Sequence, residues 1–226
     1  MLSDRIRAWL TGPGEHVQQR AAAQLIGIGQ TPSKAEPFDH VSRGLQQFLQ
    51  TLPDRDGLSI LDLGEVNQHN VAFVTGFGHR HCSEDLLGWL DTVLAVDQGE
   101  LDAGTATRIA EGLLRFPDGQ FDAVLIWDTF QFLPEPLVEA ILLRLLRVVR
   151  PGGGLFAVFQ SEARQTELTC HSFRILDART LRLVPKGTRP VRQTFSNRSL
   201  ERLFERCASM KFFLTRDSLK EVLVRR

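Results

Sequence analysis

The chain lacks a net charge and lacks the cysteine pattern of a disulfide or zinc protein. Its 226 residues contain 27 Lys and Arg against 27 Asp and Glu, so the formal net charge is +0. A neutral chain has no overall field that attracts a polyanion, which disfavours nucleic acid as a partner. The three cysteines, Cys82, Cys170 and Cys207, are odd in number and far apart, which indicates a reducing compartment and no zinc site.

We also expect no targeting segment and no membrane span in the chain. Asp4, Arg5 and Arg7 place charge at the N-terminus, and Arg144 and Arg147 interrupt the most apolar later stretch. We therefore expect a cytoplasmic protein of bacterial type with no membrane partner. No motif reports on its oligomeric state.

Glycines are largely missing from a stretch that otherwise has the pattern of a nucleotide-binding strand and turn. A short apolar run from Leu58 ends in Asp62 and Gly64, and a helix is expected from about Asn70. An α/β sheet uses this order to bring a ligand to the carboxyl end of a strand. The fold pattern is therefore intact, and the identity of the ligand is the open question.

Strand and helix candidates alternate from Gly57 onward, which favours a mostly parallel sheet with helices on both faces. The glycine-punctuated polar stretch Asp97–Arg115 stands where a third strand belongs, so that strand is expected to be short or displaced. The expected strands are 58–63, 79–83, 121–127 and 155–159, and the expected helices are 70–76, 86–96 and 137–149.

The two ends of the chain differ from this alternating middle. Residues 1–55 are expected to form a helical extension, with helices at Met1–Leu10 and Gln18–Ile28, ahead of an α/β domain over 56–226. Towards the C-terminus the pattern predicts a hairpin over 173–176 and 181–184, a helix capped by Ser196 or Asn197, and an antiparallel pair over 210–215 and 219–224. Cys207 lies on the apolar face of that helix, as a core residue.

Three blocks resemble class I S-adenosylmethionine-dependent methyltransferases: Ile60–Gly64, Phe116–Val124 and Leu146–Gly153. They occur in the family's order and spacing, and the resemblance covers about residues 57–160. It implies a Rossmann-like α/β fold ending in an antiparallel strand pair. It also implies S-adenosylmethionine as the cofactor and methyl transfer to a small-molecule acceptor.

The resemblance also implies which residues hold the cofactor. Glu84, or Asp85 in second place, would bind the ribose hydroxyls, and Glu111 would bind the adenine amino group; Asp85 is alternatively a helix cap. The full implied set is Asp62, Gly64, Glu65, Asn67, Asn70, Glu84, Glu111, Asp128 and Thr129.

Methyl transfer needs alignment and exclusion of water more than acid–base chemistry, so a catalytic base is optional. Asp128 is the best candidate for that base, and His171 is a weaker one. His69, His79 and His81 stand near Cys82, but they form no closed four-ligand set. We therefore expect no metal.

The turn departs from the family's pattern, which leaves alternatives open. Val66 and Gln68 stand where the family usually has glycine, and Glu65 adds a negative charge. These side chains could close the cofactor site and leave a catalytically inactive binding or scaffold protein. A third alternative is a pocket for another nucleotide or metabolite, because a fold does not settle a function.

Overall fold

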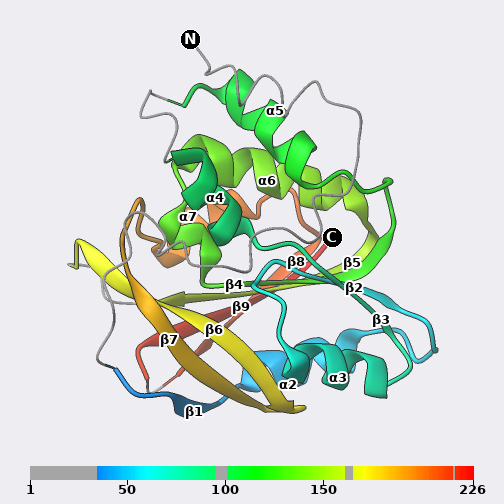
Figure 1. Cartoon of the computed structure of the whole chain (residues 1–226). Coiled ribbons are helices and arrows are strands. Elements are labelled where there is room, and N and C mark those ends of the chain that lie inside the picture. The colour runs from blue at the N-terminus through cyan, green and yellow to red at the C-terminus, as the bar shows by residue number, and fades with distance from the viewer. Residues whose placement is uncertain (1–34, 95–100, 161–164, 216) are drawn as a thin grey trace.

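The computed structural model describes residues 35–94, 101–160, 165–215 and 217–226. Within these ranges, a six-stranded sheet has the order β3-β2-β4-β5-β9-β8 (Figure 1). Its first four strands pair in parallel, and β9 and β8 add an antiparallel end, as the sequence predicted. The strands are β2 Ser59–Asp62, β3 Arg80–Ser83, β4 Phe121–Trp127, β5 Val149–Gln160, β8 Ser209–Leu214 and β9 Leu219–Arg225.

Helices cover both faces of this sheet, which confirms the predicted layering. Figure 1 shows α4 to α7 above the sheet and α2 and α3 below it. Side chains alternate along β4, so Val124 and Ile126 join the upper core, whereas Ala123 and Leu125 join the lower one. The helices are α2 Arg43–Thr51, α3 Gln68–Gly76, α4 Leu86–Leu94, α5 Ala103–Leu113, α6 Glu135–Val148 and α7 Asn197–Leu203, with a 3₁₀ turn η1 at Thr129–Phe132.

The expected third strand does not occur in the described part of its stretch, where α5 occupies residues 103–113 instead. Asp102 caps this helix, because its Oδ1 accepts a hydrogen bond from the Thr105 amide at 2.8 Å. Ala106, Ile109 and Leu113 recur at helical spacing and are buried in the upper core. Residues 95–100 lie outside the described ranges, and β3 forms the edge of the main sheet.

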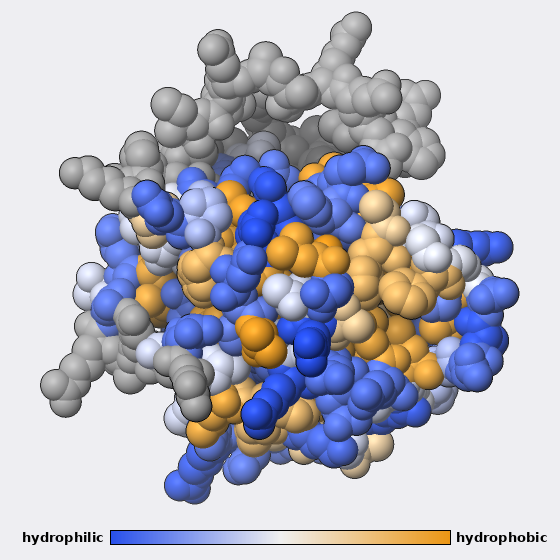
Figure 2. Space-filling view, turned by 90° about the horizontal axis from the view of Figure 1, so that it is seen from below, coloured by the Kyte–Doolittle hydropathy of each residue, from blue (hydrophilic) through white to orange (hydrophobic). Residues whose placement is uncertain are grey.

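The predicted helices Met1–Leu10 and Gln18–Ile28 lie outside the described residues. Within the rest of the predicted extension, β1 Phe38–Val41 pairs with β7, and α2 packs on the lower face of the sheet. Gly44 allows a close approach, since a Cβ there would lie 2.8 Å from the Cβ of Glu221. Seen from below, the surface is a mosaic of hydrophilic and hydrophobic residues (Figure 2).

A second sheet, with the order β1-β7-β6, lies against the lower face. The hairpin of β6 Glu167–Asp177 and β7 Thr180–Pro190 is longer on both sides of its turn than predicted. Phe173, Ile175 and Leu183 pack into the same core as Leu125 and the other lower-face residues. The hairpin crosses beneath the main sheet (yellow to orange in Figure 1).

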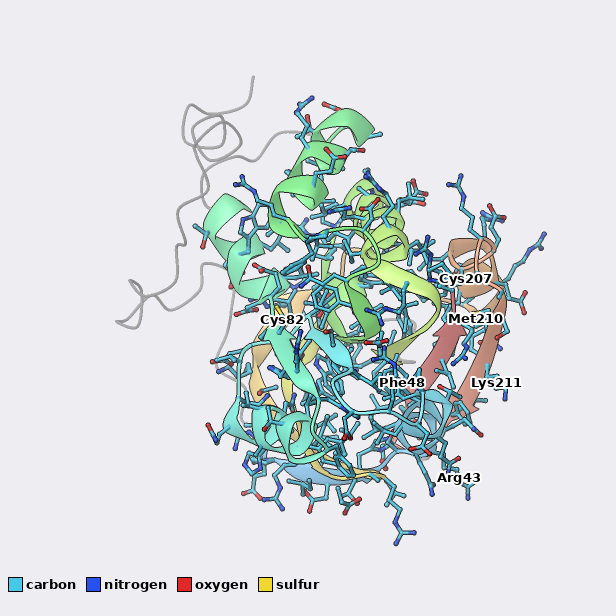
Figure 3. The ribbon with its side chains drawn as sticks, turned by 90° about the vertical axis from the view of Figure 1, so that its right-hand side faces the viewer. Arg43, Phe48, Cys82, Cys207, Met210 and Lys211 are labelled. Carbon is cyan, nitrogen blue, oxygen red and sulfur yellow. The ribbon has the colours of Figure 1, made fainter. Side chains whose placement is uncertain are left out.

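The three cysteines are free thiols. Cys207 packs against the upper core, and Figure 3 shows it beside Met210. Burial raises the pKa of the Cys207 thiol, which agrees with a packing role.

No helix in the described ranges combines the length and apolar character needed to cross a membrane.

Candidate functional site

Asp62 is the buried centre of the carboxyl edge of the sheet. It is 1% exposed at the end of β2. Its Oδ1 accepts hydrogen bonds from the Trp127 Nε1 at 2.6 Å and the Gly64 amide at 3.0 Å. Its Oδ2 accepts one from the Asn70 Nδ2 at 2.8 Å and lies 3.3 Å from the His81 Nε2. Both oxygens are therefore engaged by neighbours within the protein.

The turn after Gly64 is held by two asparagines, both predicted as cofactor-binding residues. Asn67 caps α3, because its Oδ1 accepts from the Asn70 amide at 3.0 Å. Asn70 donates to the carbonyl of Phe173 at 3.0 Å and accepts from the amide of Ile175 at 2.8 Å. These amides bind the hairpin to the turn, so their polar atoms already have partners.

The Trp127 side chain lies next to Gly64 and belongs to the core on the lower face of the sheet. A Cβ built on Gly64 would lie 3.0 Å from the Trp127 Cδ1. The indole is 3% exposed and stacks on Phe173, with ring centroids 5.0 Å apart and planes 8° from parallel. Trp127 has a φ of 57°, in the left-handed region that bulky residues rarely adopt. Such a conformation persists only where its surroundings enforce it.

The side chains that replace the family's glycines do not fill this space. Val66 is 64% exposed, and Gln68 is also exposed at the start of α3. The Glu65 carboxylate is exposed and forms an ion pair with the Lys186 Nζ at 2.8 Å. These three side chains are exposed to solvent, and the ring nearest to the Gly64 position comes from β4.

Glu84 lies at the carboxyl end of β3, beside the turn. Its amide donates to the Asp62 carbonyl at 2.8 Å, and the Ser83 hydroxyl donates to the Gly64 carbonyl at 2.8 Å. The Glu84 carboxylate is half-buried and has no hydrogen-bond partner within the described part of the chain. Burial, with a smaller contribution from Asp85, raises its pKa. Asp85 itself accepts from the Gly88 amide at 2.9 Å and so caps α4.

Asp128 and His171, the two candidate bases, lie together. The His171 Nδ1 is 3.3 Å from the Asp128 Oδ2, and both side chains are almost fully buried. The Gln160 Nε2 donates to the same Asp128 oxygen at 3.1 Å. This arrangement orients the imidazole and directs its second nitrogen away from the carboxylate.

The hairpin is tied to the carboxyl edge at further points. Arg189 on β7 forms a two-pronged ion pair with Asp91 on α4, with both N–O distances 2.5 Å. The Gln160 side chain at the end of β5 donates to the Thr169 carbonyl on β6 at 2.7 Å. Together with the asparagine and His171 contacts, these ties hold β6 and β7 over the strand ends.

Two predicted cofactor residues do not face the turn: Glu111 lies apart from it, and Thr129 faces the interior. Glu111 is on the exposed side of α5, where its carboxylate is 3.8 Å from the Arg147 Nη1. Its predicted place near the end of a third strand is therefore wrong, because that segment is helical. Thr129 is buried in η1, next to Asp128.

The candidate histidine cluster is not assembled as a metal centre. No group of three His, Cys, Asp or Glu residues that could hold a metal occurs among the described residues. His81 contacts Asp62, and His69 lies exposed on α3.

The site fits S-adenosylmethionine only in part. The Glu84 carboxylate beside Gly64, which has no partner among the described residues, suits a ligand with two hydroxyls. The indole of Trp127, however, occupies the space next to the turn. Two clefts among the described residues, of about 390 Å³ and 280 Å³, are not lined by Gly64, Glu84 or Asp128.

Comparison with known families gives one match to a family model. A family model described as a methyltransferase domain matches residues 81–157, about a third of the chain. The fold and this match confirm the resemblance to class I methyltransferases. The matched segment begins in β3, so it includes Glu84 and Asp128 but leaves out β2 and the Gly64 turn. No curated protein matches the chain significantly.

Several solved methyltransferases are similar in structure. One from Archaeoglobus fulgidus has 8% identity and a TM-score of 0.49, covering 80% of this chain and 91% of its own. One from Methanosarcina mazei has 14% identity and a TM-score of 0.45, covering 76% and 93%. The 1,6-didemethyltoxoflavin-N1-methyltransferase of Burkholderia thailandensis, solved with its substrate and S-adenosylhomocysteine, has 14% identity and a TM-score of 0.45, covering 82% and 79%.

Sequence reasoning missed Trp127 and Phe173 as residues of the site. The sequence pattern indicates only that Trp127 is the last apolar residue of a strand and that Phe173 is part of a hairpin. A tryptophan immediately before the candidate base Asp128 was the available signal, because the last residue of a parallel strand faces the ligand edge.

Proposed function

We propose that this protein is an S-adenosylmethionine-dependent methyltransferase acting on a small-molecule acceptor at the carboxyl edge of β2 to β5. The observation that carries the proposal is the half-buried, unpartnered carboxylate of Glu84 beside the Gly64 turn. A half-buried carboxylate without an internal partner costs stability, which is typical of a binding residue.

The residues that would hold the cofactor are Gly64, Ser83 and Glu84. S-adenosylmethionine, when bound, supplies a methyl group activated on a sulfonium. An acceptor hydroxyl or amine loses a proton as it is methylated, and the His171 Nε2 is the group that would take it. Asp128 would then act as the positioning residue, because it holds the Nδ1 side of the ring.

A second candidate function is favoured by the contact between Trp127 and Asp62. An indole that is stacked, hydrogen-bonded and buried above Gly64 occupies the place of a ligand. In this alternative the domain retains the fold, binds no cofactor and serves as a binding or scaffold module.

Calorimetric titration with S-adenosylmethionine and its demethylated product separates the two functions. The methyltransferase proposal expects saturable binding that weakens about tenfold in Glu84→Gln, through loss of a charge-assisted hydrogen bond. Glu111→Gln is the matched control, and its affinity should equal that of the wild type, because Glu111 lies on the outer side of α5.

Trp127→Asn tests whether the indole competes with the cofactor. Asparagine tolerates a left-handed backbone, so this change removes the ring without adding strain. We expect affinity to rise about tenfold, whereas Trp127→Phe, which keeps a ring in place, should stay near the wild type. No binding by either the wild type or a folded Trp127→Asn variant would refute the methyltransferase proposal and favour the scaffold.

A further inference from the structure

A cleft of about 390 Å³ lies at the amino ends of β2, β3 and β4. It is at the opposite edge of the sheet from Asp62, which lies at the carboxyl end of β2. Three arginines from different parts of the chain line it: Arg55 after α2, Arg80 on β3 and Arg150 on β5. Nothing in the proposed methyl transfer uses these residues.

A buried carboxylate fixes two of the three guanidinium groups. The Asp122 Oδ1 lies 2.6 Å from the Arg55 Nη2 and 2.8 Å from the Arg150 Nη1. The other oxygen of Asp122 accepts from the Ser59 amide at 2.8 Å. Because Asp122 is 2% exposed and attached to the sheet, it holds both arginines at the wall of the cleft.

Arg80 supplies a third positive charge without a balancing carboxylate. It is exposed at the first position of β3, directly opposite Ser59 in the parallel pairing. Its guanidinium has no ion-pair or hydrogen-bond partner within the described ranges. No carboxylate lines the cleft among these residues either. Asp122 offsets one of the three charges, so a local excess of two remains in a chain of zero net charge.

The remaining wall of the cleft is partly apolar. Phe121 and Cys82 face it, and both also pack in the upper core. The volume falls within the range of small-molecule sites, roughly 300–1,000 Å³, and exceeds what a single phosphate needs. The cleft therefore has room for a phosphate and for the molecule that carries it.

We propose that this cleft binds a small phosphorylated molecule, with its phosphate dianion held between Arg80, Arg55 and Arg150. Guanidinium groups match phosphate oxygens in two-pronged hydrogen bonds, and two excess positive charges balance a dianion. The site is separate from the carboxyl edge, so it does not depend on the proposed methyl transfer.

Calorimetric titration with ribose 5-phosphate, ribose and inorganic phosphate, at one fixed ionic strength, tests the proposal. Ribose 5-phosphate should bind saturably, and ribose should not. Arg80→Gln should weaken binding at least about tenfold, since it removes a charge-assisted contact. Arg80 is exposed and has no partner among the described residues, so this variant should fold like the wild type.

Arg43→Gln is the matched control. Arg43 is exposed on α2, and Figure 3 shows it well away from Cys82 of the cleft. Equal weakening by Arg43→Gln would mean non-specific attraction and would overturn the proposal. Absence of saturable ribose 5-phosphate binding up to about 10 mM would also overturn it. So would inorganic phosphate that binds as tightly as the sugar phosphate, because the site would then accept the anion alone.

Discussion

At the carboxyl edge of the main sheet, the Trp127 indole packs against Gly64 and stacks on Phe173, whereas at the amino edge Arg55, Arg80 and Arg150 line an open cleft. Parallel α/β sheets usually bind ligands at their carboxyl edge. Within the part of this chain that the structure describes, a cleft of about 390 Å³ lies at the other edge. Topology thus indicates where a site is expected, while individual side chains decide where space exists.

The buried carboxylates at the two edges also have different partners. At the carboxyl edge, Asp62 is enclosed by donors from the turn, α3, β3 and β4. At the amino edge, Asp122 is buried, but its two arginine partners are about half-exposed. Loss of the Asp62 carboxylate would leave buried hydrogen-bond donors that water cannot reach. Loss of the Asp122 carboxylate would leave two arginines that water can solvate.

The largest expected effect is therefore that of Asp62→Ala. Removal of a buried acceptor with several donors should lower the free energy of unfolding by about 3–4 kcal/mol. Urea denaturation measures this loss. The exposed Asp56→Ala is the control and should change stability by less than about 0.5 kcal/mol. Similar results for the two variants would show that Asp62 is not a structural centre.

Asp122→Ala should have a smaller effect, about 1–2 kcal/mol, because only the Ser59 amide is left without its acceptor in a partly buried place. The same denaturation assay applies, with Asp54→Ala as the exposed control. A loss as large as that of Asp62→Ala would contradict the contrast between the edges.

Glu84→Gln should stabilise the protein at pH 7. Burial raises the pKa of Glu84 in the folded state, so its ionised form opposes folding. The stability of the wild type relative to the variant is greatest at pH values below the ordinary Glu pKa of about 4.3 and is lost as pH rises through the raised value. Thermal unfolding from pH 4 to 8 should show the advantage of Glu84→Gln only at the higher pH, and Glu111→Gln should show none.

The smallest expected effect is that of Val66→Gly combined with Gln68→Gly on S-adenosylmethionine affinity. Both side chains are exposed, so their removal creates no space above Gly64. Calorimetry should show a dissociation constant within about twofold of the wild type. A tenfold gain in affinity would show that Val66 and Gln68 hinder binding, and it would contradict the role of Trp127.

Local sequence patterns predicted much of this architecture. Asp85 and Ser196 cap their helices, Glu84 and Asp128 follow their strands, and the C-terminal strand pair is antiparallel. Each of these features depends on residues close together in the chain, where strand and helix periodicity and capping chemistry act. The α5 segment was missed because glycines on its outer side resembled turn residues.

Which side chains meet in the site depends on contacts between segments that are distant in the sequence. The sequence by itself determined the order of strands and helices and the carboxylates that end the strands, because spacing and burial preference act locally. Only the tertiary structure decided that Trp127 stacks on Phe173 over Gly64, that His171 meets Asp128, and that three arginines share one cleft. Such contacts depend on how the hairpin and strand ends pack in three dimensions, and periodicity along the chain carries no record of that packing.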